Sequence, residues 1–151
     1  MFIRIKRIKA GEYAYLVHNA WTKQGPKQKV KKYLGKVTRP EIVKNMDFNN
    51  YRDTKDFKKY VDDNTQFSII RDLVDWELAR RGLDKKSLKK QVMAINEGYL
   101  CAYMVKRLMN IQITSGEYED QVALAKAFVD AGIAIPQELF VAYFQKQAQI
   151  L

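Results

Sequence analysis

The chain has 151 residues, 47% of them hydrophobic and 29% charged, and its formal net charge is +10. This composition can support a buried core and a well-solvated surface. No run of about 18 apolar residues occurs, so we expect no membrane-spanning helix. The single cysteine, Cys101, excludes an internal disulfide, and Met1–Ala10 lacks the apolar stretch of a secretory signal. We therefore expect a cytoplasmic protein.

The start of the chain predicts three strands joined by short turns. Residues 1–9 alternate charged and branched side chains, which is the period of a half-buried strand. Residues 13–22 are rich in aromatic and branched side chains, and residues 27–37 follow the turn marked by Gly25 and Pro26. Short connections between consecutive strands favour an antiparallel meander.

The pattern changes after the third strand, and this change sets the predicted domain boundaries. We expect a basic β-rich head over residues 1–40, a polar connector over 41–53 and a helical body over 54–151. The predicted fold class is α+β, with a three-stranded antiparallel β-meander head followed by an all-helical body of about five helices.

The predicted helices of the body are marked by apolar spacing and by residues typical of helix ends. They are a short helix over Thr54–Asp62; a helix capped by Thr65 that runs to about Arg81 and stops at Gly82; a helix capped by Ser87 that carries Leu88, Val92 and Ile95; a helix or continuation over 96–113; a helix over Tyr118–Ala131 behind a Thr114–Glu117 capping box and before Gly132; and a last helix opened by Pro136.

The excess positive charge lies entirely in the predicted head. Residues 1–40 contain eleven Lys or Arg residues and one acid, Glu12, which gives a formal charge of +10. The other 111 residues hold equal numbers of basic and acidic side chains. Charge that is segregated in this way points to a polyanionic partner.

Strict alternation would give the head one apolar face, covered by helices, and one basic face with interleaved aromatic side chains. On this basis Arg4 and Lys6 lie opposite Ile3 and Ile5, and Lys29, Lys31 and Tyr33 lie opposite Val30, Lys32 and Leu34. Lysines can neutralise phosphates and aromatic rings can stack on bases. The candidate nucleic-acid contacts are Arg4, Lys6, Lys9, Lys23, Lys27, Lys29, Lys31, Lys32, Tyr33 and Lys36.

A short sequence pattern runs through Tyr15–Val17 and Lys29–Val37, the second of which reads VKKYLGKV from Val30. It resembles the N-terminal β region of insertion-sequence transposases of the IS4/IS1634 type. The resemblance covers residues 1–39 and implies a DNA-contacting accessory head, with Lys29, Lys31, Lys32 and Tyr33 as candidate contacts. The rest of the chain is too short for a nuclease domain, so transposase activity is not implied.

Residues that could support catalysis are few and carry no accompanying motif. His18 and Cys101 could form a base and a thiol nucleophile, and Asp62 with Asp63 could bind magnesium if a third carboxylate joined them. A buried cysteine and a solvated helix end are the competing interpretations. We therefore expect no enzyme activity, no metal and no cofactor.

The end of the chain predicts two helices around a glycine-containing turn, as in a DNA-binding helix-turn-helix. The second of these helices is mostly apolar, whereas a recognition helix needs polar and basic residues. It indicates instead a homodimer or protein-partner interface, with a fully buried terminal helix as the alternative. The candidate interface residues are Leu139, Phe140, Tyr143 and Phe144.

Taken together, the sequence predicts a non-catalytic nucleic-acid-binding protein that contacts mainly the phosphate backbone, with DNA slightly ahead of RNA. The alternative is a protein-interaction adaptor whose basic head binds an acidic partner and whose helical body docks or dimerises. Competition with generic nucleic acid separates these two functions, and cleavage on addition of metal would reveal a small nuclease.

Overall fold

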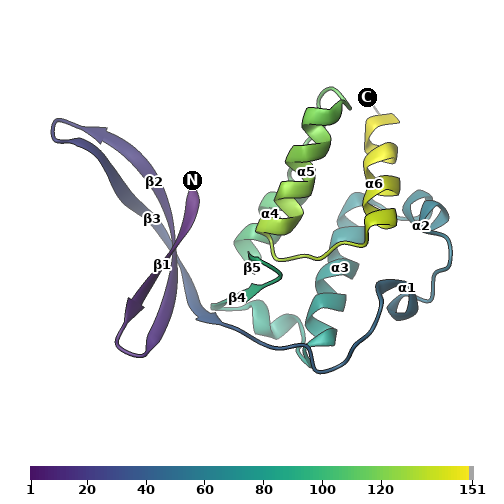
Figure 1. The fold of residues 1–151 in the computed structure, drawn as a ribbon, viewed down its shortest axis with the longest axis horizontal. Helices are drawn as coiled ribbons and strands as arrows, with labels where there is room; N and C mark the ends of the chain where they lie inside the picture. Colours follow the sequence, from purple (N-terminus) through teal and green to yellow (C-terminus); the bar gives the residue numbers. More distant parts are fainter. Residues whose placement is uncertain (150–151) are drawn as a thin grey trace.

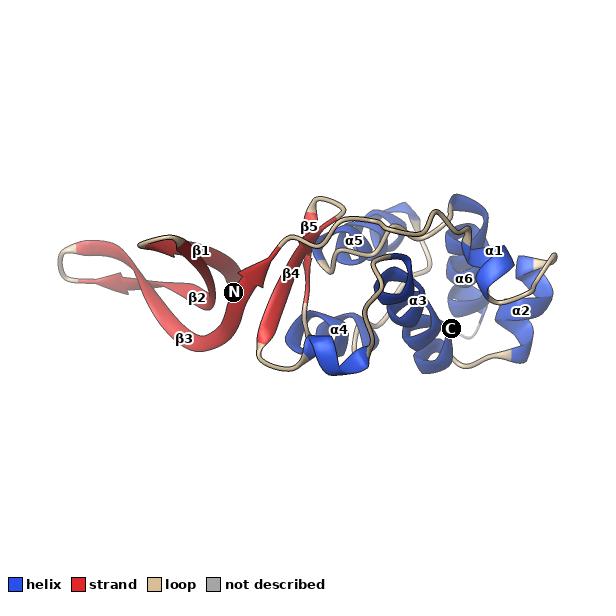
Figure 2. Ribbon diagram, turned by 90° about the horizontal axis from the view of Figure 1, so that it is seen from below, coloured by secondary structure: helices blue, strands red, loops and turns tan. Residues whose placement is uncertain are grey.

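The computed structural model describes residues 1–149, and its fold is α+β with a five-stranded mixed sheet and six α-helices. The strands lie in the order β1-β2-β3-β4-β5. Figures 1 and 2 show the sheet at one end of the molecule and the helices gathered at the other. The predicted α+β class is therefore confirmed, whereas the detail of the body differs.

The predicted meander is present as β1 (Phe2–Ile8), β2 (Gly11–Thr22) and β3 (Gly25–Thr38). Both pairs of neighbouring strands are antiparallel. Because β1 pairs with β2 only as far as Val17, the outer ends of β2 and β3 continue as a two-stranded ribbon. Figure 1 shows this ribbon projecting away from the helices.

The pairing of β2 with β3 shifts twice in the three-stranded part of the head, before the ribbon begins. Ala14 lies opposite Gly35 and Tyr15 opposite Tyr33, so one residue of β3 is left over. The same happens between the pairs Leu16–Lys32 and Val17–Val30, where Lys31 is the extra residue. Each shift is a β-bulge, which reverses the face on which the following side chains of β3 lie.

The body is not all-helical, because the predicted helix capped by Ser87 is wrong. Its sequence forms a 3₁₀ turn over Lys85–Leu88 and then the hairpin of β4 (Gln91–Ile95) and β5 (Gly98–Leu100). The spacing of apolar residues there suits a helix as well as a strand, and β4 is selected because it pairs in parallel with the end of β3. The sheet thus continues across the predicted boundary between head and body.

The turn of this hairpin also differs from the prediction of a helix over 96–113. Asn96 and Glu97 both have positive φ, at 49° and 65°, which is typical of a two-residue hairpin turn. Gly98 then lies so close to α5 that a side-chain carbon there would be 1.9 Å from the Val129 carbonyl oxygen. Any other residue at Gly98 would force the hairpin away from the helix.

The described chain also contains six α-helices. They are α1 (Phe48–Tyr51), α2 (Phe57–Asp63), α3 (Gln66–Arg80), α4 (Ala102–Met109), α5 (Tyr118–Asp130) and α6 (Gln137–Gln149). The predicted cap of α3 is confirmed, since Thr65 Oγ1 accepts a hydrogen bond from the Ser68 amide at 3.1 Å. The region predicted as a connector contains α1, whose Phe48 is buried against Trp76.

The start of α5 lies where it was predicted, but the capping box does not form. Glu117 makes no side-chain cap hydrogen bond. Instead Asp120 reaches back, and its Oδ2 accepts from the amides of Thr114, Ser115 and Gly116 at 3.0, 2.7 and 3.0 Å. These bonds lower the pKa of the Asp120 carboxyl, the amide of Ser115 contributing most. The loop and the first turn of α5 are therefore held by one carboxylate.

The core is built around α3 and the short strands of the body. Apolar side chains of α3, including Ile70 and Leu73, are fully buried together with Val92 and Met93 of β4. One charged side chain, Glu77, is also fully buried there, beside Arg80 and Arg81. Burial raises the pKa of the Glu77 carboxyl, and the two guanidinium groups oppose that rise.

The candidate partner interface on α6 lies mostly inside the protein. Leu139 and Tyr143 are fully buried and Phe144 is nearly so, while Phe140 is half-buried. Phe128 of α5 contacts the rings of both Phe140 and Tyr143 edge-on, at centroid distances of 6.2 and 5.8 Å. The structure corrects the interpretation of this stripe, because its aromatic width is used to pack α6 against α5.

Candidate nucleic-acid interface

All ten candidate contacts lie on the three strands of the head or on their turns. Arg4 and Lys6 belong to β1, Lys9 and Lys23 to the two turns, and the remaining six residues to β3. Nine of the ten are exposed, and Lys6 is half-buried. The structure therefore brings the predicted residues onto one projecting element, although it distributes them over two faces.

The two β-bulges decide which candidate residues share a face. Residues directly opposite each other in an antiparallel pair point to the same side of the sheet. Tyr33 lies opposite Tyr15, whereas Lys29 lies opposite His18 and Lys32 opposite Leu16. Lys29 is thus on the other face from Tyr33, and the expected grouping of Lys29, Lys31 and Tyr33 is wrong because strict alternation does not hold through the bulges.

The resulting lysine face contains Lys27, Lys29 and Lys32, which lie opposite Ala20, His18 and Leu16 of β2. All three lysines are exposed. Their side chains share one face of β3. No carboxylate forms an ion pair with them in the described part of the chain. Three unneutralised ammonium groups in a row match the repeating charge of a phosphate backbone.

The opposite, aromatic face contains Tyr15 and Tyr33, whose ring centroids are 5.1 Å apart. The Lys6 ammonium lies 4.8 Å above the Tyr15 ring, which accounts for its partial burial. Tyr33 remains 51% exposed, so much of its ring is free to contact a ligand. Arg4 also lies on this face, opposite Tyr15, and donates a hydrogen bond to Gln28.

The one acid of the head is bound by two arginines. Arg39 donates two hydrogen bonds to the Glu12 carboxylate, both at 3.1 Å, and Arg7 lies 3.8 Å from the same group. The hydrogen bonds from Arg39 lower the pKa of the Glu12 carboxyl. Glu12 is therefore already paired at the base of the ribbon and does not neutralise the lysines farther out.

The basic surface extends from the head onto the body, both at the second basic cluster of the sequence, around Lys85–Lys90, and at α4. Lys32 lines one groove together with Lys89 and Lys90, and a second groove together with Lys106 and Arg107 of α4. Neither groove is lined by an acidic residue. The second pair of cations lies more than seventy positions from Lys32 in the sequence, so only the folded structure reveals this extension.

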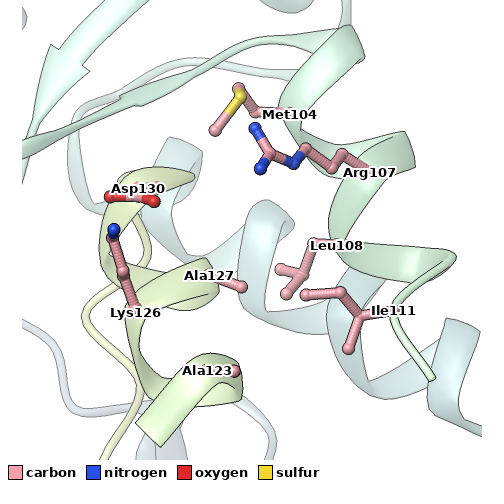
Figure 3. Close-up of a pocket in the computed structure, with 8 residues that line it drawn as sticks. All are labelled: Met104, Arg107, Leu108, Ile111, Ala123, Lys126, Ala127 and Asp130. Carbon is pink, nitrogen blue, oxygen red and sulfur yellow. The ribbon is translucent and has the colours of Figure 1, made fainter. Parts of the chain in front are cut away.

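A third cavity, between α4 and α5, differs in character from these grooves. Figure 3 shows Arg107, Leu108 and Ile111 on one side of it, and Ala127 with Lys126 beside Asp130 on the other. Its volume is about 270 Å³, at the small end for a ligand pocket. Because charges of both signs line it, it does not continue the cationic surface.

The residues considered for catalysis belong to different elements: His18 to β2, Cys101 to the start of α4, and Asp62 and Asp63 to α2. Cys101 is buried, and burial raises the pKa of its thiol, which disfavours the reactive thiolate. Asp62 and Asp63 end α2, where Lys146 of α6 donates a hydrogen bond to the Asn64 carbonyl at 2.9 Å. Among residues 1–149, no three His, Cys, Asp or Glu side chains gather as metal ligands do. Nor does this part of the chain contain a helix that could cross a membrane.

Comparison of the chain with protein-family models, curated proteins and solved structures yields no match. The resemblance of residues 1–39 to IS4/IS1634-type transposases thus stays a prediction that depends on the head alone. Function has to be inferred from the geometry and charge of the ribbon.

Proposed function

We propose that this protein is a non-catalytic nucleic-acid-binding protein that binds the phosphate backbone through the ribbon formed by β2 and β3. The supporting observation is the row of Lys27, Lys29 and Lys32, exposed on one face of β3, with Lys27 and Lys29 on the projecting ribbon and Lys32 at its base, and with no carboxylate partner among the described residues. Such a row loses little internal pairing when it binds phosphates, and counterion release drives the association.

The shape of the ribbon supports this proposal, and so does its charge. Beyond Val17 the ribbon is only two strands wide, and Figure 1 shows it standing clear of the helices. A two-stranded ribbon fits the major groove of B-form DNA, which is about 12 Å wide, while the major groove of A-form RNA is too narrow to admit it. Together with the transposase resemblance, this favours DNA over RNA.

The body contributes to the proposed interface through α4. The groove shared by Lys32, Lys106 and Arg107 gives the phosphate backbone a continuous cationic path from ribbon to body. Contacts of this kind fix position without reading sequence, so we expect weak sequence preference.

The proposal is tested by binding of the intact chain to duplex DNA, single-stranded DNA and structured RNA across a salt series. We expect tight binding at low salt, a steep loss on adding salt, and DNA ahead of RNA. Polyglutamate is added as a competitor. The adaptor function predicts that this acidic polypeptide displaces the bound nucleic acid from the protein as effectively as unlabelled nucleic acid does. No nucleic-acid binding at low salt would reject the proposal in favour of the adaptor.

A further inference from the structure

The outer end of the ribbon carries a large aromatic side chain that the protein itself does not use. Trp21 lies opposite Pro26, one residue pair inside the turn of Lys23 and Gln24, and its side chain is 85% exposed. The other tryptophan, Trp76, is 4% exposed, and its indole N–H donates to the Met46 carbonyl at 2.8 Å. Of the two tryptophans, therefore, only Trp21 is free to contact a ligand.

The turn that carries Trp21 is well formed. Thr22 Oγ1 donates a hydrogen bond to the Gly25 carbonyl at 2.7 Å, and Lys27 Nζ donates to the Gln24 side chain at 2.6 Å. Gly25 supplies the positive φ, 101°, that the end of the turn requires. The backbone that carries the indole is thus held in place at the tip, away from the core.

The surroundings of Trp21 are cationic. Lys23 and Lys27 flank it, and the nearest acid along either strand is Glu12 at the base of the ribbon, already bound by Arg39. The strand pairing places Trp21 on the aromatic face, in line with Val17 and Tyr15, while Lys27 points to the lysine face. An aromatic platform on one face of a narrow ribbon whose other face carries ammonium groups can contact a base while the ribbon binds the neighbouring phosphates.

We propose that Trp21 stacks on an unpaired base, so that the ribbon, whose lysine face binds duplex DNA, binds DNA with unpaired bases more tightly. This inference rests on the proposed function and adds the class of nucleic acid to it. Stacking on a base that is already unpaired gains the full contact, whereas insertion into a duplex first costs the unstacking of a base step. The tip therefore distinguishes unpaired from paired DNA, and the lysine face binds both.

The experiment measures binding of the wild-type chain and of the variants Trp21→Ala and Trp21→Phe to a single strand of about 20 nucleotides and to the matching duplex. Tryptophan fluorescence is followed in the same titration. We expect Trp21→Ala to lose about 5- to 100-fold in affinity for the single strand and less than about 2-fold for the duplex. Trp21→Phe retains most of the affinity, since it keeps an aromatic face.

The fluorescence provides a second, independent readout. Single-stranded DNA should quench the emission of the wild-type chain, and the quench should vanish in Trp21→Phe, because the remaining Trp76 is buried. Trp21 is exposed and lies outside the hydrophobic core, so circular dichroism of the variants should match that of the wild type.

Two results separate failure of this inference from failure of the proposed function. Base stacking by Trp21 is rejected, while ribbon binding stands, if Trp21→Ala binds the single strand as tightly as the wild type does. The same conclusion follows if the variant loses the same affinity for the single strand and for the duplex. If the wild-type chain binds neither DNA, both the stacking and the proposed function fall together.

Discussion

Gly35 of β3 lies directly against the backbone of Lys90, at the point where the head joins the body. A side-chain carbon at Gly35 would be 2.8 Å from the Lys90 carbonyl oxygen, and the residue has a φ of 142°. Gly35 is also one of the residues at the first β-bulge. The position therefore requires glycine both for its backbone conformation and for the close approach.

We predict that Gly35→Ala lowers the free energy of unfolding by about 2–4 kcal/mol, since it adds backbone strain to a steric clash. Urea denaturation measures this change. Gly25→Ala is the matched control, because Gly25 also has positive φ but nothing lies within 4 Å of the added carbon. The control should lose about 1 kcal/mol. Equal losses in the two variants would show that the contact with Lys90 contributes nothing.

A second prediction concerns the carboxylate that holds the start of α5. Because the pKa of Asp120 is lowered in the folded chain, its stabilising contribution is present above the usual aspartate pKa, 3.8, and is lost as the pH falls through the folded value. We expect Asp120→Asn to be less stable than the wild type at pH 7, with the difference shrinking below about pH 4.

Denaturation at several pH values tests this expectation. Glu119→Gln is the control, since Glu119 is its exposed neighbour in the same helical turn. A destabilisation by Asp120→Asn that stays constant down to acid pH would mean that its charge is not the cause.

A third prediction tests the packing of α6. Leu139→Ala should cost about 2–5 kcal/mol of stability, because Leu139 is fully buried and its removal leaves a cavity. Val141→Ala, on the exposed side of the same helix, should cost less than about 1 kcal/mol. If Leu139→Ala instead altered the oligomeric state at unchanged stability, the partner-interface interpretation of this helix would be restored.

A fourth prediction concerns the extension of the interface onto α4. Lys106→Gln should weaken DNA binding by up to about 5-fold, the effect of one exposed charge contact. Lys126→Gln removes the same charge from the cavity of Figure 3, beside Asp130, and should change the affinity little. Identical effects of the two variants would argue that α4 acts only through overall charge.

The sequence predicted the parts of the fold that local patterns encode. The three strands of the head follow from alternation and turn residues, and the start of α3 follows from Thr65. The hairpin of β4 and β5 could not be predicted, because the spacing of Val92 and Ile95 also fits a helix and only pairing with β3 selects the strand.

The candidate site shows the same division between local and tertiary information. The lysines themselves could be identified from charge segregation, but their faces could not, since β-bulges leave little trace in the sequence beyond Gly35. Lys106 and Arg107 were missed because they meet Lys32 only in the folded chain. Trp21 was visible as an aromatic residue near a turn, but its exposure is a property of the ribbon.

The central claim is that the lysine face of the ribbon binds the phosphate backbone. Deleting the head is a poor test, because Lys36–Thr38 pair with β4 and their removal would expose the sheet of the body. Point variants avoid this problem. Lys27, Lys29 and Lys32 are exposed, and none of them forms an ion pair within the described chain.

The most direct measurement is the salt dependence of duplex DNA binding for the triple variant Lys27→Gln, Lys29→Gln, Lys32→Gln. Its control is Lys55→Gln, Lys58→Gln, Lys59→Gln, which removes three exposed lysines from the start of α2. We predict that the ribbon variant loses affinity and that its slope of log affinity against log salt falls by about 2–3, whereas the control keeps the wild-type slope. An unchanged slope in the ribbon variant, or the same fall in both, would contradict the claim.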